Sequence, residues 1–264
     1  MSTNVYILLD RSGSMASKWS DTIGTINAYV RALADRGHDG TVTVLSFSSG
    51  GSFNSFQQAR LLGVPAPAPA NDAGVQSRTG NAEMLAHGVA VKASEWAPLG
   101  TEVLAMGGTP LYDAISHIVA VTQQDRNPTG VLVIMTDGEE NSSSVCNKDS
   151  AKLLLDGVRA RGWKIDQLGV EFDNYTQAAA VGTSVRNTVS MSRGAMRSGA
   201  VSDSMAHSTM SYTASGVDTG YGDDFKGLMG DPTVQAAVGK TVAAVGEVAK
   251  KALKRAAEKV KKEG

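Results

Sequence analysis

The chain has 264 residues, of which 42% are hydrophobic and 19% charged, and its formal net charge is −1. This length suffices for one α/β domain with a full core and an appendage, and the balanced charge excludes a surface that is basic overall and made for nucleic acid. Cys146 is the only cysteine, and the apolar run near the N-terminus is too short for a signal peptide or a membrane span, so we expect no disulfide, no membrane partner and a cytoplasmic location.

The first predicted element is a strand over residues 5–9, a run of apolar side chains that includes β-branched and aromatic ones. Such a run is typical of a strand that is buried on both faces of a parallel sheet. The next residues place a carboxylate and two hydroxyls on one tight turn, Asp10-Arg11-Ser12-Gly13-Ser14-Met15. This turn leaves the sheet at its carboxyl edge, where open α/β sheets bind ligands. The turn therefore indicates a metal site.

A helix is predicted next, with Ser17 or Ser20 as its N-cap and an end near Asp35, because apolar side chains recur there at helical spacing. Residues 41–47 alternate enough to form a second strand. Residues 52–58 are expected to form an antiparallel strand at the edge of the sheet.

The stretch from residue 59 to residue 106 loses this regular pattern. Alternating prolines and alanines over residues 65–70 favour an extended, poorly paired segment, and residues 82–96 are expected to contain a short helix. The stretch lies between two of the polar motifs. It either frames the site or forms a surface excursion, and the second interpretation is the more common one for such a segment.

A second polar motif follows in Gly107-Gly108-Thr109-Pro110. Thr109 and Pro110 are typical of a helix N-cap and the first helical residue. Apolar residues at helical spacing then predict a helix that runs to about Gln124. Thr109 is thereby expected at the start of a helix, with its hydroxyl near the sheet edge.

The third motif follows a further buried strand, predicted over residues 131–135. The strand ends in Thr136-Asp137-Gly138, an acid in a glycine turn. Because parallel strands end at the same edge of a sheet, Asp137 is expected at the same edge as Asp10.

The rest of the domain alternates helices and strands. We predict a helix over residues 150–161, a strand over 163–172, a short helix over 175–181, a last strand over 188–191 and a terminal helix over 194–212. This alternation predicts an α/β fold with a mostly parallel central sheet, to which the expected edge strand adds one antiparallel member.

The C-terminal part differs in composition. Residues 216–232 are a Gly- and Asp-rich linker, and residues 233–264 are a basic tail with an amphipathic helix predicted over 233–262. Three interpretations of the tail remain open: a solvated helix, a helix for self-association or partner docking, and a binder of anionic membrane or nucleic acid. Its alanine-rich face would bury little apolar area, which disfavours a membrane, and we favour docking or self-association.

The three motifs together offer oxygen ligands only, which suit a hard cation such as Mg²⁺. The candidate ligands are two carboxylates and three hydroxyls: Asp10, Ser12, Ser14, Thr109 and Asp137. A cation held largely by neutral hydroxyls keeps much of its field for an incoming anion, so we expect one position open to an external carboxylate. Each motif alone is common as a cap, a helix start or a turn, but their joint occurrence in this order indicates a metal site.

At these positions the chain resembles the von Willebrand factor type A (vWA) family, whose metal-ion-dependent adhesion site (MIDAS) has the pattern Asp-x-Ser-x-Ser, then Thr, then Asp. All of these positions match. The resemblance covers about residues 3–215 and implies a domain over residues 1–215 with a Rossmann-like sheet, helices on both faces and a bound Mg²⁺ or Mn²⁺. It also implies recognition of a partner protein through an acidic side chain, and no catalysis.

Two hypotheses of function follow. The chain is most similar to stand-alone vWA proteins of bacteria and bacteriophages, which predicts a cation-dependent adaptor or assembly factor whose partner presents an Asp or Glu. Members of this family often work beside AAA+ ATPases, so such an ATPase is a candidate partner. The alternative is a structural or virion-associated phage protein, located in the host cytoplasm or the virion, in which the metal loop mainly stabilises the fold and the basic tail drives assembly.

We do not expect an enzyme. The four histidines have no metal-binding spacing, and no Gly-x-Ser-x-Gly elbow is present. No phosphate-binding glycine loop follows the first strand. The sequence therefore names no pair of nucleophile and base.

Overall fold

The structure of the protein is a computed structural model, which describes residues 2–49, 76–100, 104–222 and 226. Within these ranges the strands form a seven-stranded sheet in the order β3-β4-β2-β1-β5-β6-β7. The strands are β1 (Asn4–Asp10), β2 (Thr41–Ser49), β3 (Gln76–Thr79), β4 (Ala82–Lys92), β5 (Gly130–Thr136), β6 (Lys164–Val170) and β7 (Thr188–Met191). The edge strand predicted over residues 52–58, the extended segment over 65–70 and the basic tail lie outside the described residues.

The sheet is parallel from β2 to β7 and antiparallel at its other edge. β1 pairs in parallel with β2 and β5, and β6 and β7 continue the same direction. β4 runs antiparallel to both β2 and β3. The predicted α/β architecture, a mostly parallel sheet with an antiparallel edge, is confirmed.

The short helix predicted within residues 82–96 is wrong. These residues form β4 and a single turn of 3-10 helix over Ala93–Glu95. Ala82, Met84 and Ala86 alternate along β4 and are buried in the core. The strand also pairs with a neighbour on each side, and this tertiary pairing outweighs the helical preference of its alanine, glutamate and leucine residues.

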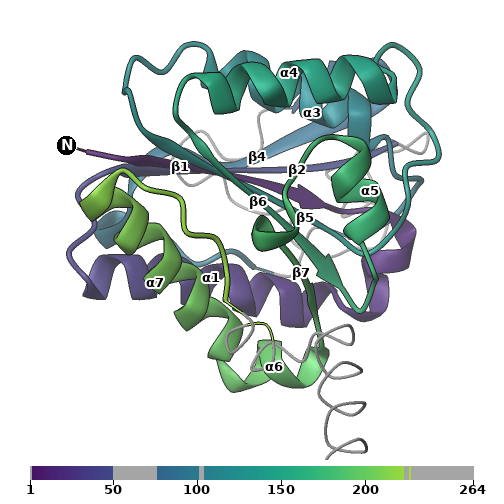
Figure 1. Cartoon of the computed structure of the whole chain (residues 1–264). Coiled ribbons are helices and arrows are strands. Elements are labelled where there is room, and N and C mark those ends of the chain that lie inside the picture. The colour runs from purple at the N-terminus through teal and green to yellow at the C-terminus, as the bar shows by residue number, and fades with distance from the viewer. Residues whose placement is uncertain (1, 50–75, 101–103, 223–225, 227–264) are drawn as a thin grey trace, which may run out of the picture.

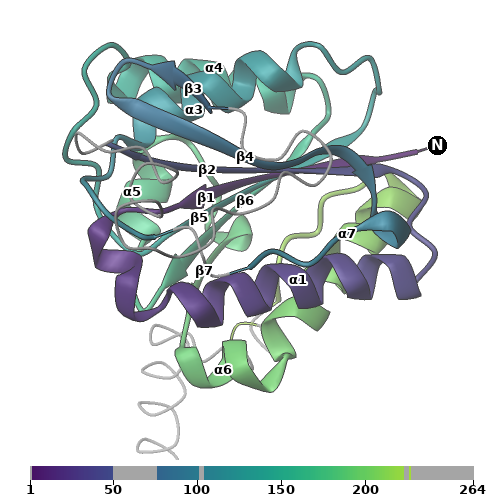
Figure 2. The same ribbon diagram turned by 180° about the vertical axis from the view of Figure 1, so that it is seen from behind.

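Helices cover both faces of the sheet, as Figure 1 shows and Figure 2 confirms from behind. One face carries α1 (Trp19–Asp35), α6 (Arg193–Ser198) and α7 (Ala200–Ser215), the other carries α3 (Leu111–Thr122) and α4 (Lys148–Ala160), and α5 (Tyr175–Ala180) lies near the carboxyl edge. Among the described residues, no helix has the length and apolar character needed to cross a lipid bilayer.

The terminal helix predicted over residues 194–212 is in fact two helices. Gly199 has a φ of +79° and separates α6 from α7. Left-handed backbone of this kind ends a helix and is adopted without steric cost by glycine. The break lets α6 and α7 cover different parts of the same face of the sheet.

The central strands are buried on both faces, as predicted for residues 5–9. Val5, Ile7 and Leu9 of β1 pack in the cluster that includes side chains of α1, α6 and α7. Tyr6 and Leu8 pack on the opposite face, with side chains of α3 and α4. This division follows from the two-residue repeat of a strand. It holds β1 in the middle of the sheet and so fixes where the residues after Leu9 emerge.

A buried ion pair at the start of β6 anchors the chain that follows α7. The Lys164 ammonium contacts the Asp166 carboxylate, and both side chains are 1% exposed. Asp218 Oδ1 lies 3.2 Å from the same ammonium, and the Tyr221 hydroxyl donates to Asp166 Oδ2 at 2.9 Å. Two residues of the predicted linker, Asp218 and Tyr221, therefore contact β6.

Lys164→Met should lower the free energy of unfolding by about 3–5 kcal/mol, because it leaves a buried carboxylate without its cation. The matched control is Lys152→Met, since Lys152 pairs with Asp156 where the two side chains are 48% and 42% exposed. Lys152→Met should lower the free energy of unfolding by less than about 1 kcal/mol. Urea denaturation measures both; equal losses would show that the buried pair is no anchor.

Candidate metal centre

The candidate metal centre lies at the carboxyl edge of the sheet, where β1 and β5 end side by side (Figure 1). Leu9 of β1 is level with Met135 of β5, so Asp10 and Thr136 come next to each other. The Thr136 hydroxyl donates a hydrogen bond to Asp10 Oδ2 at 2.6 Å. The pairing of two parallel strands thus sets the first carboxylate in place.

The loop after β1 gathers two hydroxyls beside this carboxylate. The Ser12 amide donates to Asp10 Oδ1 at 2.7 Å, a turn that aspartates commonly form with the amide two positions on. Ser12 Oγ then lies 3.0 Å from Ser14 Oγ. Ser12 is buried and Ser14 is exposed, so the pair reaches from the core to the surface.

The second loop of the centre, which carries Thr109 and leads into α3, packs against the first loop, the one after β1. Two glycines, Gly13 and Gly107, allow this packing. Gly107 has a φ of +81°, and a Cβ there would lie 2.1 Å from the Ser49 carbonyl oxygen, so the position requires glycine. The Gly13 amide donates to Gly107 O at 2.9 Å, and the Gly108 amide donates to Ser49 Oγ at 2.6 Å. These contacts hold the buried Thr109 close to the first loop.

Thr109 does not cap the helix that follows it, contrary to the prediction. α3 begins at Leu111, and Pro110 occupies the N-cap position without a side-chain capping bond. The backbone of Thr109 pairs with Asn141 instead: its amide donates to Asn141 Oδ1 at 2.9 Å, and its carbonyl accepts from the Asn141 amide at 3.2 Å. The Thr109 hydroxyl therefore has no capping role.

The third loop carries Asp137 directly after β5. Ser14 Oγ donates to Asp137 Oδ1, and Lys18 Nζ donates to Asp137 Oδ2, each at 2.7 Å. A Cβ on Gly138 would lie 3.5 Å from Ser14 Oγ and 3.7 Å from Thr109 Oγ1. The hydroxyls of the first and second loops therefore both lie against the third loop.

The spacing of these oxygens suits a small divalent cation. Adjacent ligands of an octahedral Mg²⁺, each about 2.1 Å from the ion, lie about 3.0 Å apart. The Ser12 and Ser14 hydroxyl oxygens are separated by 3.0 Å, and Ser14 Oγ is 2.7 Å from Asp137 Oδ1. The donors are carboxylates and hydroxyls, the ligand types that a hard cation prefers.

The candidate centre differs from a site made of acidic, histidine or cysteine ligands alone. Among the described residues, no group of three or more His, Cys, Asp and Glu side chains is arranged to hold a metal ion. Asp10 and Asp137 supply two carboxylates, and the further donors are hydroxyls from the first and second loops. A search for clustered acids would therefore miss this centre.

Burial favours the protonated, neutral form of the Asp10 carboxyl. Burial raises the pKa of Asp10 to about 6, while hydrogen bonds from Thr136 and Ser12 act in the opposite direction. The negative charge of the nearby Asp137 raises the pKa of Asp10 further. A bound divalent cation would offset these carboxylate charges, so cation binding and deprotonation of Asp10 would favour each other.

Two acidic residues that follow the second and third motifs, Asp113 and Glu140, hold the loops, and no pattern in the sequence predicts this role. Glu140 accepts hydrogen bonds from three backbone amides, those of Tyr112, Ser142 and Ser143. Asp113, which is fully buried, accepts from the amides of Asn81, Ser144, Val145 and Cys146. These carboxylates tie the third loop to α3.

Thr136 and Lys18 also contact the two aspartates of the centre, and neither was among the residues predicted from the sequence. Thr136 could have been found, because it ends a strand predicted to lie beside Asp10. Lys18 could not, because it lies beyond the first turn and at no strand end, so no rule of sheet geometry places its side chain beside Asp137. No local pattern signals such a pair.

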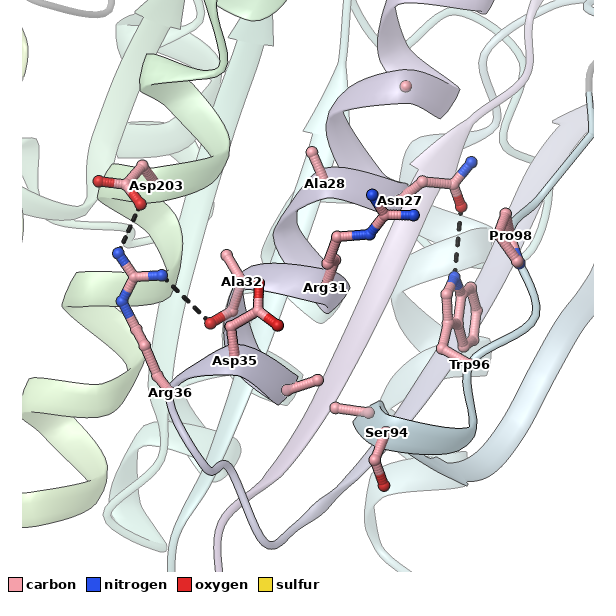
Figure 3. Close-up of a pocket in the computed structure, with 13 residues that line it drawn as sticks. Asn27, Ala28, Arg31, Ala32, Asp35, Arg36, Ser94, Trp96, Pro98 and Asp203 are labelled. Carbon is pink, nitrogen blue, oxygen red and sulfur yellow. Dashed lines mark hydrogen bonds and ion pairs between the residues drawn. The ribbon is translucent and has the colours of Figure 1, made fainter.

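A hollow of about 610 Å³ lies away from this centre, on the outer side of α1 (Figure 3). The Trp96 indole donates to Asn27 Oδ1 at 3.3 Å, and Arg36 pairs with Asp203 at 2.5 Å. The polar side chains that line the hollow are thus partly paired with one another. None of the five candidate ligands lines this hollow.

Known structures share this fold, although no protein-family model and no curated protein sequence matches the chain. The vWF domain of the type V pili tip protein Mfa5 from Porphyromonas gingivalis is 8% identical with a TM-score of 0.52, over 80% of this chain and 96% of that one. The pilus adhesin SpaC from Lactobacillus rhamnosus GG is 12% identical with a TM-score of 0.52, over 78% of this chain and 30% of the adhesin.

A third similar structure is proximal thread matrix protein 1 from the mussel byssus, solved with its MIDAS motif occupied by zinc. It is 14% identical with a TM-score of 0.47, over 78% of this chain and 48% of that protein. This chain thus spans about half of the mussel protein and less than a third of the adhesin. At identities this low, the likeness establishes the fold alone.

Asp10→Asn should remove a pH-dependent part of the stability. The pKa of Asp10 in the folded protein, about 6, lies above the value of about 3.9 expected in the unfolded chain. The folded state therefore binds this proton more tightly, and its stability falls as pH rises from about 4 to about 6. In EDTA, the parent should lose on the order of 2–3 kcal/mol relative to Asp10→Asn across this window.

Urea denaturation at pH 4, 5, 6 and 7 measures this difference. Asp149→Asn, at an exposed position of α4, controls for the loss of one negative charge. A gap between the parent and Asp10→Asn that stays constant with pH would show that burial does not hold a proton on Asp10.

Proposed function

We propose that this chain, which has the von Willebrand factor type A fold, is a divalent-cation-dependent module that binds a partner protein. The ligands of the Mg²⁺ or Mn²⁺ ion are Asp10, Ser12, Ser14, Thr109 and Asp137, and the ion binds an Asp or Glu side chain of the partner. The observation that carries the proposal is the position of the Ser14 hydroxyl, 3.0 Å from the Ser12 hydroxyl and 2.7 Å from the Asp137 carboxylate.

The exposure of the site supports access by a partner. Asp10 and Ser12 are buried, whereas Ser14 and its neighbour Gly13 are exposed. The candidate ligands thus run from the core to the surface, which would leave one side of the ion open. A cation held mainly by hydroxyls keeps a strong attraction for a further carboxylate.

The hydroxyls are the ligands to test first, because their removal leaves the charge of the site unchanged. In Ser14→Ala/Thr109→Val, the affinity for Mg²⁺ measured by calorimetry should fall by at least about a hundredfold, since loss of a supporting partner of a metal ligand alone costs about 10–100-fold. Ser17→Ala is the matched control, as Ser17 is an exposed serine of the same 3-10 helix, Gly13–Ser17. Unchanged Mg²⁺ affinity in the double variant would overturn the assignment.

Chelation should release the partner without unfolding the chain. Affinity capture from the native host, in Mg²⁺ and in EDTA, should recover the same partner only with Mg²⁺, and Ser14→Ala/Thr109→Val should not recover it. The melting temperature in each buffer reports on the fold. A partner retained in EDTA, together with a lowered melting temperature, would contradict the proposal and favour a purely structural metal loop.

A further inference from the structure

We propose that Lys18 acts as an internal counter-ion of the site, and that its contact with Asp137 weakens the binding of the divalent cation. This inference rests on the proposed function, because it concerns the same site. It makes Lys18 a residue that sets the affinity of the site without being a ligand.

The contact itself is close and shielded from solvent. Lys18 Nζ lies 2.7 Å from Asp137 Oδ2, and the two side chains are 15% and 0% exposed. The other oxygen of the same carboxylate accepts from Ser14 Oγ at 2.7 Å. Hydrogen bonds between charged groups at this distance are among the strong ones in proteins. A metal ion that binds Asp137 therefore meets a carboxylate whose charge the ammonium already offsets, and the two cations repel each other.

The local structure alone does not favour a lysine at this position. Lys18 occupies the N-cap position of α1, where the helix dipole disfavours a cation. The acid in the first turn, Asp21, pairs with Arg193 and Arg197. The contact with Asp137 compensates for the unfavourable position, and such breaks of a local rule are expected at functional sites.

The ammonium can leave Asp137 without any change in the loop backbone. The Lys18 amide donates to Met15 O at 2.9 Å, and the Lys18 carbonyl accepts from the Thr22 amide at 2.9 Å and the Thr22 hydroxyl at 3.0 Å. These bonds fix the backbone, while the four-carbon stem of lysine is flexible. A rotation of the side chain therefore suffices to exchange the ammonium for a metal ion.

Arg11, the buried cation of this loop, cannot replace Lys18 in this role. Arg11 is 1% exposed, and its guanidinium lies 3.4 Å from Glu83 and donates to Leu104 O at 3.3 Å. Both of these partners belong to elements other than the third loop. Neutralising Lys18 should therefore leave Asp137 without a cation from the first loop and available to a metal ion.

The test is a Mn²⁺ titration in which the spectrum of free Mn²⁺ is followed by electron paramagnetic resonance. Lys18→Met should bind Mn²⁺ about tenfold or more tightly than the parent, the order expected when one competing charged hydrogen bond is lost. Lys18→Arg keeps the charge and should stay within about threefold of the parent. Lys152→Met, on the exposed face of α4, controls for the change in net charge.

The outcomes separate this inference from the proposed function. If the parent binds Mn²⁺ and folded Lys18→Met binds it equally or more weakly, Lys18 is no competitor, and the metal site stands. If neither protein binds Mn²⁺, both proposals are overturned. Binding by Lys18→Met alone would support the inference. Circular dichroism checks the fold, and Lys18→Gln, whose amide still donates, replaces the Met variant if that variant unfolds.

Discussion

Two buried carboxylates at one edge of the sheet are the constraint on which the candidate centre depends. As whole residues, Asp10 is 0% and Asp137 is 7% exposed, and a carboxylate removed from water is very costly unless charges or hydrogen bonds compensate. Backbone pairing of β1 and β5 brings them together. The compensation comes from the Ser12 amide, the Thr136 and Ser14 hydroxyls and the Lys18 ammonium. Of these hydroxyls, that of Ser14 is also a candidate ligand of the divalent cation.

The loops are also held by contacts that do not involve the candidate ligands' side chains. Gln177 of α5 accepts from the Glu140 amide at 2.8 Å and donates to Gly138 O at 3.3 Å. Asn141 pairs with the backbone of Thr109, and Asp113 gathers the amides that follow. Such support matters because a metal site functions only when its ligands are held close to their final geometry. The centre therefore depends on more residues than those that would touch an ion.

The strands that carry the centre could be predicted because burial on both faces produces uninterrupted apolar runs, as in β1 and β5. The meeting of Asp10 with Asp137 followed from the rule that parallel strands end at one edge. β4 could not be predicted, because its strand character comes from pairing with β2 and β3 rather than from its own residues. The contact of Lys18 with Asp137 could not be predicted for a similar reason, since it depends on tertiary packing and Lys18 lies at no strand end.

The candidate centre requires that oxygen donors from three loops share a single divalent cation. The most direct measurement is a crystal structure of the protein grown with Mn²⁺, in which anomalous scattering locates the ion. We expect one strong peak about 2–2.3 Å from both Ser12 Oγ and Ser14 Oγ, with Thr109 and the two aspartates beside it. A peak elsewhere, or ordered loops without a peak at saturating Mn²⁺, would show that these donors share no cation.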